Sequence, residues 1–284
     1  MSASEGNFTV RTMVREDLYK AYEWSIEEGW NIGKYDHDVF FATDPTGFFI
    51  GELNGEPIGS ISGVAYDPHF GFVGIYILRP QYRGLGYGIQ IFNAAMQYLG
   101  DRTVGLDGVI AQQDNYRRSG FEFCYRNIRN EYIPPSGTAD FTGIVSASDV
   151  PFEQLLAYDT AHFPANRPVF LKGLIAEPES TALVSLKDGE IDGFGVIRAF
   201  SHGWSVGPLF AETEATANKL FAALSSGHVG EPVYLDTPEP NNGAKALVAR
   251  FGMSPVFETA RMYRGAIPQI PIQSMYGVTT YELG

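Results

Sequence analysis

The chain has 284 residues, of which 44% are apolar and 19% charged, as in an ordinary globular protein. Its formal net charge of -13, with no run of lysine or arginine, disfavours nucleic acid and acidic membranes as partners. With one cysteine, no signal-like start in MSASEGNFTV and no apolar run of about 18 residues, we expect no disulfide, no membrane span and a cytoplasmic location.

The same order of elements occurs twice along the chain. Each half opens with a strand, a capping region and an amphipathic helix, in FTVRTMVREDLYKAYEW and again in TGIVSASDVPFEQLLAYDT. A hairpin follows in each half, where alternating apolar runs flank Asn54-Gly55 or Asp188-Gly189. Both dipeptides are typical of type I′ turns, because each can place two successive residues at positive φ.

Each hairpin leads to a further strand, FVGIYIL or WSVGPLF, and then to a helix. The apolar residues that recur there at helical spacing are Ile89, Phe92, Met96 and Leu99 in the first half, and Ala217, Leu220, Phe221 and Leu224 in the second. Both halves continue with a strand that contains Leu-Asp, at Asp107 and at Asp236, and with a short helix that ends near Gly120 or Gly252.

This repetition predicts a tandem duplication of one α+β unit. The segment PPSGT, residues 134–138, has the composition of a linker between the copies. We therefore expect two domains, at residues 1–135 and 139–284.

Three glycines alternate in the turn Arg83-Gly84-Leu85-Gly86-Tyr87-Gly88, which follows the strand FVGIYIL. Their spacing differs from the dinucleotide fingerprint G-x-G-x-x-G, and no Gly-Lys-Ser/Thr follows as in a P-loop. The pattern instead predicts a turn with free amides at the start of a helix, which favours a phosphate-bearing ligand. A turn that only connects the strand to the helix is the alternative.

The segment from Arg83 to Gly88 resembles the R/Q-x-x-G-x-G/A signature of the GNAT superfamily of acyl-CoA N-acyltransferases. The neighbouring segments ILRPQY and YRRSGF are also similar to family segments, and the resemblance runs from about Phe8 to Tyr132. The second half resembles the degenerate GNAT repeat of tandem family members, and the ending MYGVTTYELG is similar to theirs.

This resemblance implies two tandem GNAT-like domains, each a mixed, mostly antiparallel sheet flanked by helices. It further implies acetyl-CoA as the co-substrate and direct attack by an amine of a small molecule or amino acid, with a backbone amide near Ile77 polarising the thioester. The residues implied at the coenzyme are Ile75, Ile77, Leu78, Arg79, Arg83, Gly84, Leu85, Gly86, Tyr87 and Gly88.

Two proton transfers accompany this reaction. Tyr116 lies where family members often place the acid that protonates the leaving thiolate, and a phenol pKa of about 10 suits that thiol. An aromatic ring packed under the short helix is the alternative for Tyr116. For the base, Asp107 is the first candidate, although Leu-Asp-Gly at a strand end is also typical of a turn, and Glu28, Asp38 and Asp67 stay open.

We expect the second half to shape the acceptor site and not to catalyse. It lacks the glycine turn, and Val248 stands at the tyrosine position. The acceptor is expected to meet Trp30, Tyr35 and His37 from the segment GWNIGKYDHD, together with Asp236. Those aromatic residues could equally belong to the core.

One departure from the family keeps a second function open. An asparagine that often contacts pantetheine is replaced by Val109, whereas the second half has Asn241 at the corresponding place. The alternative is a non-catalytic protein that binds or senses coenzyme A or an amino acid. The five histidines are scattered, so we expect no metal. For assembly we expect a monomer or a homodimer.

Overall fold

A computed structural model describes residues 6–284. The strands are β1 (Phe8–Thr12), β2 (Phe48–Leu53), β3 (Glu56–Ala65), β4 (Phe70–Leu78), β5 (Thr103–Val109), β6 (Glu122–Tyr132), β7 (Ile144–Ser146), β8 (Ser180–Lys187), β9 (Glu190–Ala199), β10 (Trp204–Ala211), β11 (Val233–Pro238), β12 (Ser254–Arg264) and β13 (Met275–Gly277). The helices are α1 (Arg15–Glu27), α2 (Asp36–Thr43), α3 (Tyr87–Leu99), α4 (Gln113–Arg118), α5 (Phe152–His162), α6 (Pro168–Ile175), α7 (Glu214–Ser225) and α8 (Asn242–Phe251).

The predicted duplication is present in the order of the elements. The series from β1 to β6 is repeated, helix for helix and strand for strand, by the series from β7 to β12. Both hairpins have the predicted turn, since φ is 56° and 81° at Asn54 and Gly55, and 54° and 86° at Asp188 and Gly189. Helix α2 begins at Asp36, so the end of the segment GWNIGKYDHD, from which acceptor contacts are predicted, is helical.

The predicted inward face of the second-half helix is confirmed, whereas that of the first-half helix needs one correction. In α7 all the predicted positions are buried. In α3 the buried residues are Ile91, Phe92, Ala95 and Leu99, and Ile89 is 52% exposed. Ile89 lies in the first turn of α3, beside a cavity described below, so it has no core to face.

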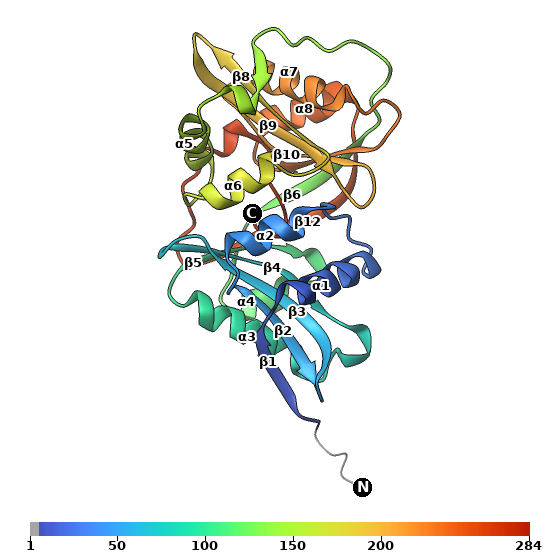
Figure 1. Cartoon of the computed structure of the whole chain (residues 1–284), viewed down its shortest axis with the longest axis vertical. Helices are drawn as coiled ribbons and strands as arrows, with labels where there is room; N and C mark the ends of the chain where they lie inside the picture. The colour runs from blue at the N-terminus through green and yellow to red at the C-terminus, as the bar shows by residue number, and fades with distance from the viewer. Residues whose placement is uncertain (1–5) are drawn as a thin grey trace.

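The strands of residues 6–284 join in one sheet in which the two halves exchange a strand (Figure 1). The order is β1-β2-β3-β4-β5-β12-β6-β11-β10-β9-β8-β7, with β13 on β10. Strand β12 of the second half lies between β5 and β6 of the first, antiparallel to both, and β6 in turn pairs with β11. The α+β prediction is confirmed, since β4/β5 and β10/β11 are parallel and the other pairs antiparallel.

Because of this exchange, the two halves share a continuous sheet. The domain roles predicted for residues 1–135 and 139–284 remain a prediction.

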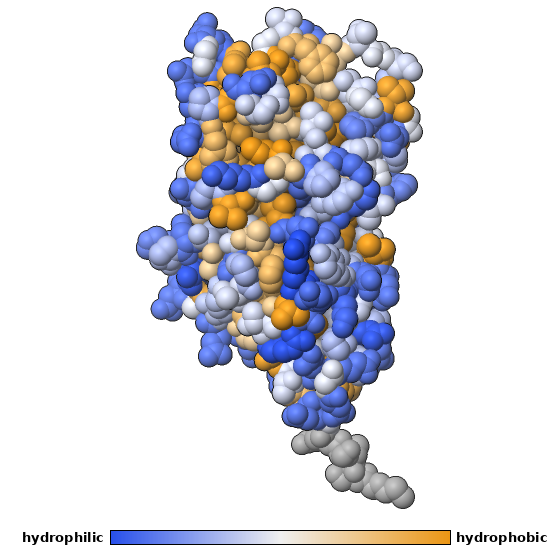
Figure 2. All heavy atoms as spheres, in the orientation of Figure 1, coloured by the Kyte–Doolittle hydropathy of each residue, from blue (hydrophilic) through white to orange (hydrophobic). Residues whose placement is uncertain are grey.

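Helices cover both faces of the first-half sheet. Buried residues of α1 and α2 join one core cluster with β2 and β3, while α3 packs against the opposite face. Helix α2 also packs against α6, so the first cluster continues into the second half at the middle of the molecule (Figure 1). On the face of the molecule drawn in Figure 2, more apolar surface lies over the upper, C-terminal half than around β1. No helix in the described part of the chain is long and apolar enough to cross a membrane.

Candidate active site

Strand β4 contains a β-bulge at its centre. On the facing strand β3, Ser62 pairs with Gly74 and Ser60 with Ile77, so β4 carries one residue more than its partner. Ile75 lies in this bulge with φ of 46°, a left-handed conformation that is rare for a β-branched residue. Such backbone strain costs about 1–3 kcal/mol and is concentrated at functional sites.

The bulge coincides with the point where the parallel strands β4 and β5 separate. Their pairing ends at Val73 and Leu106, although the strands continue to Leu78 and Val109. Val73 packs in the cluster under α3, whereas Ile75, two positions later, packs in the cluster under α1. After the bulge, the side chains of β4 therefore point to the opposite faces of the sheet, because one extra residue reverses the alternation of a strand. A gap opens between the two strand ends.

The glycine turn closes the end of this gap. Gly84 and Gly86 have φ of 75° and 82°, a region open to glycine at no steric cost. Gly86 is the N-cap of α3 and no side chain caps that helix, so its first amides are free to meet an anion. At Gly88 a Cβ atom would lie 2.7 Å from the Tyr76 hydroxyl oxygen, so a side chain there would crowd the turn.

A cavity of about 1000 Å³ joins the turn, the separated strands and the second half. First-half residues in its wall include Trp30, Ile75, Ile77, Arg83, Gly86 and Tyr116. Second-half residues in its wall include Ser201, His202, Tyr234, Phe257, Tyr281 and Glu282. No group of three or more histidine, cysteine, aspartate or glutamate residues within 6–284 is arranged to hold a metal ion.

Most of the residues predicted at the coenzyme line this cavity. They are Ile75, Ile77, Leu78, Arg83, Gly84, Gly86 and Gly88. The other three lie outside its wall: Arg79 is 3.5 Å from Glu56, Leu85 is 63% exposed, and Tyr87 packs on Phe8. Arg83 donates to the carbonyl of Leu78 and pairs with Glu28 at 2.5 Å.

Tyr116, the predicted acid, lies in the cavity wall against the rings of Phe92 and Phe121. Gly108 makes room for it, since a Cβ atom there would lie 2.5 Å from the Tyr116 ring. Burial, with a smaller effect of the neighbouring Tyr76, raises the pKa of Tyr116 above its ordinary value. The phenol is therefore protonated at neutral pH and has a proton to give.

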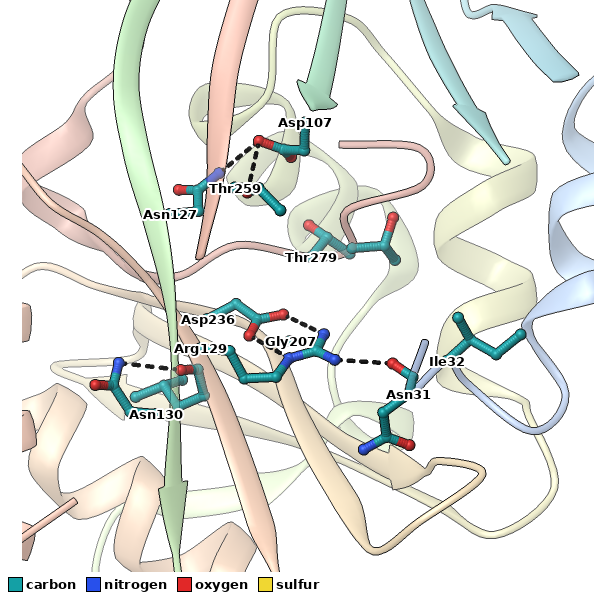
Figure 3. Close-up of polar contacts among 12 residues, drawn as sticks. Asn31, Ile32, Asp107, Asn127, Arg129, Asn130, Gly207, Asp236, Thr259 and Thr279 are labelled. Carbon is teal, nitrogen blue, oxygen red and sulfur yellow. Dashed lines mark hydrogen bonds and ion pairs between the residues drawn. The ribbon is translucent and has the colours of Figure 1, made fainter. Parts of the chain in front are cut away.

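Asp107 and Asp236, the paired Leu-Asp positions, make equivalent ion pairs across the exchanged strands. Arg261 on β12 holds Asp107 through Nε at 3.0 Å and Nη2 at 2.6 Å. Arg129 on β6 holds Asp236 at 2.8 and 2.7 Å. Figure 3 shows Asp236 facing Arg129 and Asp107 facing Asn127, whose amide donates at 2.8 Å. Arg261 therefore pairs with the carboxylate predicted as the base, and Arg129 pairs with the one predicted to contact the acceptor.

The structure separates the other predicted acceptor residues. Trp30 lines the cavity. Tyr35 lies outside it and donates its hydroxyl hydrogen to Glu179 at 2.7 Å. His37 also lies outside and packs edge-on against Tyr22, and burial lowers its pKa. Of these residues only Trp30 is therefore in a position to contact a ligand of the cavity.

In the second half, residues 275–284, which we call the closing segment, enter the gap that corresponds to this opening. Strand β13 of this segment pairs with β10 at Leu209 and Gly277. Val278 donates its amide hydrogen to the carbonyl of Asp236 on β11, at 2.9 Å. A Cβ atom on Gly207, the counterpart of Gly74, would lie 2.6 Å from the carbonyl oxygen of Val278. The closing segment thus lies between β10 and β11, where the first half has its cavity.

The closing segment then continues into the first-half site. A Cβ atom on Gly74 would lie only 1.9 Å from the carbonyl oxygen of Glu282, so the segment touches β4 immediately before the bulge. Tyr66 holds the carbonyl of Leu283 at 2.9 Å. Glu282 is not among the residues predicted from the sequence, where the only signal was the resemblance of the ending to those of tandem GNAT proteins.

Comparisons with known proteins agree with this geometry. The family model described as acetyltransferase (GNAT) family matches residues 13–121, and the one described as acetyltransferase (GNAT) domain matches residues 155–277. The structure is similar to a putative acetyltransferase from Pyrococcus horikoshii, with a TM-score of 0.84 at 20% identity over 100% of this chain and 98% of that one. It also resembles a tandem GNAT protein from the clavulanic acid biosynthesis pathway, with a TM-score of 0.61 at 12% identity over 93% and 100% of the chains.

In sequence the chain is 32% identical to the holothin acyltransferase of Pseudoalteromonas sp. (strain SANK 73390). That match covers 264 residues, or 92% of this chain and 90% of the relative. An identity of this size over nearly the whole length, with both halves matched separately, establishes the family. The chain therefore belongs to the GNAT superfamily of acyltransferases, as two GNAT domains in tandem.

Proposed function

We propose that this protein transfers an acyl group, acetyl in the simplest case, from coenzyme A to a primary amine of a small molecule. The observation that carries the proposal is the single cavity that connects the glycine turn, the bulge of β4 and the Tyr116 hydroxyl. These are, in order, a site for phosphates, a place for an extended thioester arm and a proton donor for its sulfur.

The residues of the first half fit coenzyme A. Free amides at Gly86 and the start of α3 suit the diphosphate. Gly88 adds no side chain to this surface, and a Cβ atom there would lie 2.7 Å from the Tyr76 hydroxyl oxygen. Beyond Val73 and Leu106 the pairing of β4 and β5 ends, which leaves unpaired strand edges along which an extended pantetheine arm would lie. We expect one coenzyme per chain, because the closing segment fills the corresponding gap of the second half.

Bound acyl-CoA supplies a thioester carbon that is already activated toward an amine. The amine nitrogen forms a bond to that carbon as the carbon–sulfur bond breaks. Tyr116 donates its phenolic proton to the departing sulfur. Burial raises the pKa of this phenol, so it is protonated when the reaction begins. No residue of the chain is acylated in this scheme.

The second half supplies the acceptor side of the cavity. Its aromatic side chains Tyr234, Phe257 and Tyr281 contribute to the wall of the cavity. A cleft between two halves is a common place for a small-molecule site. The relative named holothin acyltransferase makes holothin the first acceptor to try. A cytoplasmic location and a monomeric or homodimeric state stay predictions.

Thiol release from acetyl-CoA tests this proposal. The full chain is incubated with holothin and with a panel of primary amines and amino acids, and free thiol is measured together with the mass of the acceptor. We expect release that depends on an acceptor, with one acylated product per thiol. Tight binding of acetyl-CoA without any acceptor-dependent release would instead favour the non-catalytic sensing function.

Gly88→Val is expected to weaken binding of acetyl-CoA strongly while leaving the fold intact, because the atom that it crowds is the hydroxyl at the end of the Tyr76 side chain. Its Cβ atom would lie 2.7 Å from the Tyr76 hydroxyl oxygen, in the wall of the cavity. We expect the added methyl groups to displace two hydrogen bonds to phosphate, each about 1.5–3 kcal/mol, which lowers affinity by about 100-fold or more. Calorimetric titration measures the affinity and the number of sites per chain. Gly137→Val is the matched control, since nothing lies within 4 Å of a Cβ atom at this linker position. Equal affinities in the two variants would contradict the phosphate assignment.

A further inference from the structure

Four carboxylates line the cavity, and three of them are engaged by neighbouring side chains. The engaged ones are Glu28 with Arg83, Asp107 with Arg261 and Glu131 with the hydroxyl of Tyr234. The fourth is Glu282, from the closing segment. Among residues 6–284, no other residue donates a hydrogen bond to its carboxylate and no cation lies within 4.0 Å of it, so its one donor is its own backbone amide. Glu282 is thus the cavity carboxylate whose lone pairs are available to a ligand.

The backbone fixes Glu282 next to the place where we expect the thioester. Its carbonyl lies against Gly74, and Gly74 precedes the left-handed Ile75 of the bulge. On the other side, Tyr66 binds the carbonyl of Leu283 at 2.9 Å, and Arg167 reaches that of Gly284 at 3.2 Å. A side chain held on a rigid segment in this way keeps its orientation, which proton transfer requires.

We propose that Glu282 is the general base, which takes the proton from the attacking amine. This inference rests on the proposed acyl transfer and names a catalytic residue for it. The nitrogen gives one proton to the Glu282 carboxylate as it forms the bond to the acyl carbon, and Tyr116 gives one proton to the sulfur as the carbon–sulfur bond breaks. The proton on Glu282 then returns to Tyr116 through solvent, so the products are an amide and free coenzyme A.

The surroundings of Glu282 suit this task. Burial, reinforced by the negative charge of Asp36, raises the pKa of Glu282 to about 7, and Arg129 limits the rise. The charged or titratable groups that face it are Asp36 on α2, Tyr22 on α1, Arg129 on β6 and Arg198 on β9. A base with a pKa near the working pH is half ionised there and still accepts a proton readily. Because the ionised form is the active one, activity falls as the pH drops through about 7.

Glu282→Gln tests the proposal by its pH profile. We expect kcat for the transfer of acetyl from acetyl-CoA to holothin or a panel amine to fall by about 10²- to 10⁴-fold, with unchanged affinity for acetyl-CoA. The acidic limb of the profile should disappear with it. Glu282→Asp should restore part of the rate and of that limb. Glu258→Gln, a glutamate on β12 outside the cavity, is the matched control. A wild-type rate and profile in Glu282→Gln would overturn the assignment.

A second measurement needs no acceptor and so separates this inference from the proposed function. Carbon NMR of the protein labelled at its glutamate carboxyl carbons, with Glu282→Gln to assign the signal, gives the pKa of Glu282 directly. We expect a value near 7 in the presence of coenzyme A. An ordinary glutamate pKa, below about 5, would overturn the role of Glu282 even if the enzyme acylates amines. No wild-type turnover with any acceptor would contradict the proposed function, and with it the role of Glu282, whatever the pKa.

Discussion

Tyr116→Phe is expected to lower kcat by about 10²- to 10⁴-fold, because the variant keeps the ring but loses the proton that the thiolate needs. The ring contacts with Phe92 and Phe121 remain, so the melting temperature should change little. Steady-state kinetics with acetyl-CoA and the best acceptor of the panel measure the first quantity, and thermal unfolding measures the second.

The matched control for this change is Tyr132→Phe. Tyr132 packs on Phe221 and Phe251 in the second half, away from the cavity, so its loss of a hydroxyl should leave kcat unaffected. If Tyr116→Phe instead melts earlier and turns over normally per folded molecule, Tyr116 is a core aromatic, which is the alternative stated for it from the sequence.

Asp107→Asn is expected to destabilise the fold by about 3–5 kcal/mol, because it leaves the Arg261 guanidinium buried without its counter-charge. The side chains of Asp107 and Arg261 are 0% and 3% exposed, so water cannot take over the lost partner. Urea unfolding followed by circular dichroism measures the free energy of unfolding.

Glu258→Gln gives the scale for this effect. Glu258 lies on the same strand β12, but its pair with Arg126 is exposed, and such pairs contribute about 0–1 kcal/mol. A loss in Asp107→Asn no larger than in this control would show that the buried pair is not needed for stability. The kcat of the folded Asp107→Asn variant distinguishes the two candidates for the base, since we expect turnover of the folded protein to fall by about 10²- to 10⁴-fold only if Asp107, and not Glu282, takes the proton.

The exchanged strands give the two Leu-Asp positions a common explanation. Each half contributes an aspartate from its fifth strand and an arginine from its last long strand, and each arginine lies opposite the other half's aspartate in the ladder. The pairs Arg261–Asp107 and Arg129–Asp236 therefore lie on the seam between the halves. They join the halves by charge as well as by backbone hydrogen bonds, and both are buried.

The sequence by itself determined the features that depend on neighbouring residues. The type I′ turns follow from Asn54-Gly55 and Asp188-Gly189, because few dipeptides can place two successive residues at positive φ. The free amides before α3 follow from the glycines at 84, 86 and 88, which leave the helix start without side chains. The duplication follows from the recurrence of the same local patterns, which needs no knowledge of how the copies meet.

Only the tertiary structure decided which strands pair across the halves and which carboxylate is free. The pattern of β12 would be the same beside either half, so its place between β5 and β6 is set by long-range packing and by the Arg261–Asp107 pair. The tertiary structure also pairs Asp107 with Arg261, a contact that its Leu-Asp-Gly sequence does not indicate. Glu282 lies in a segment without a regular pattern, and its place beside Gly74 depends on a contact between residues about 200 positions apart, which no local spacing can reveal.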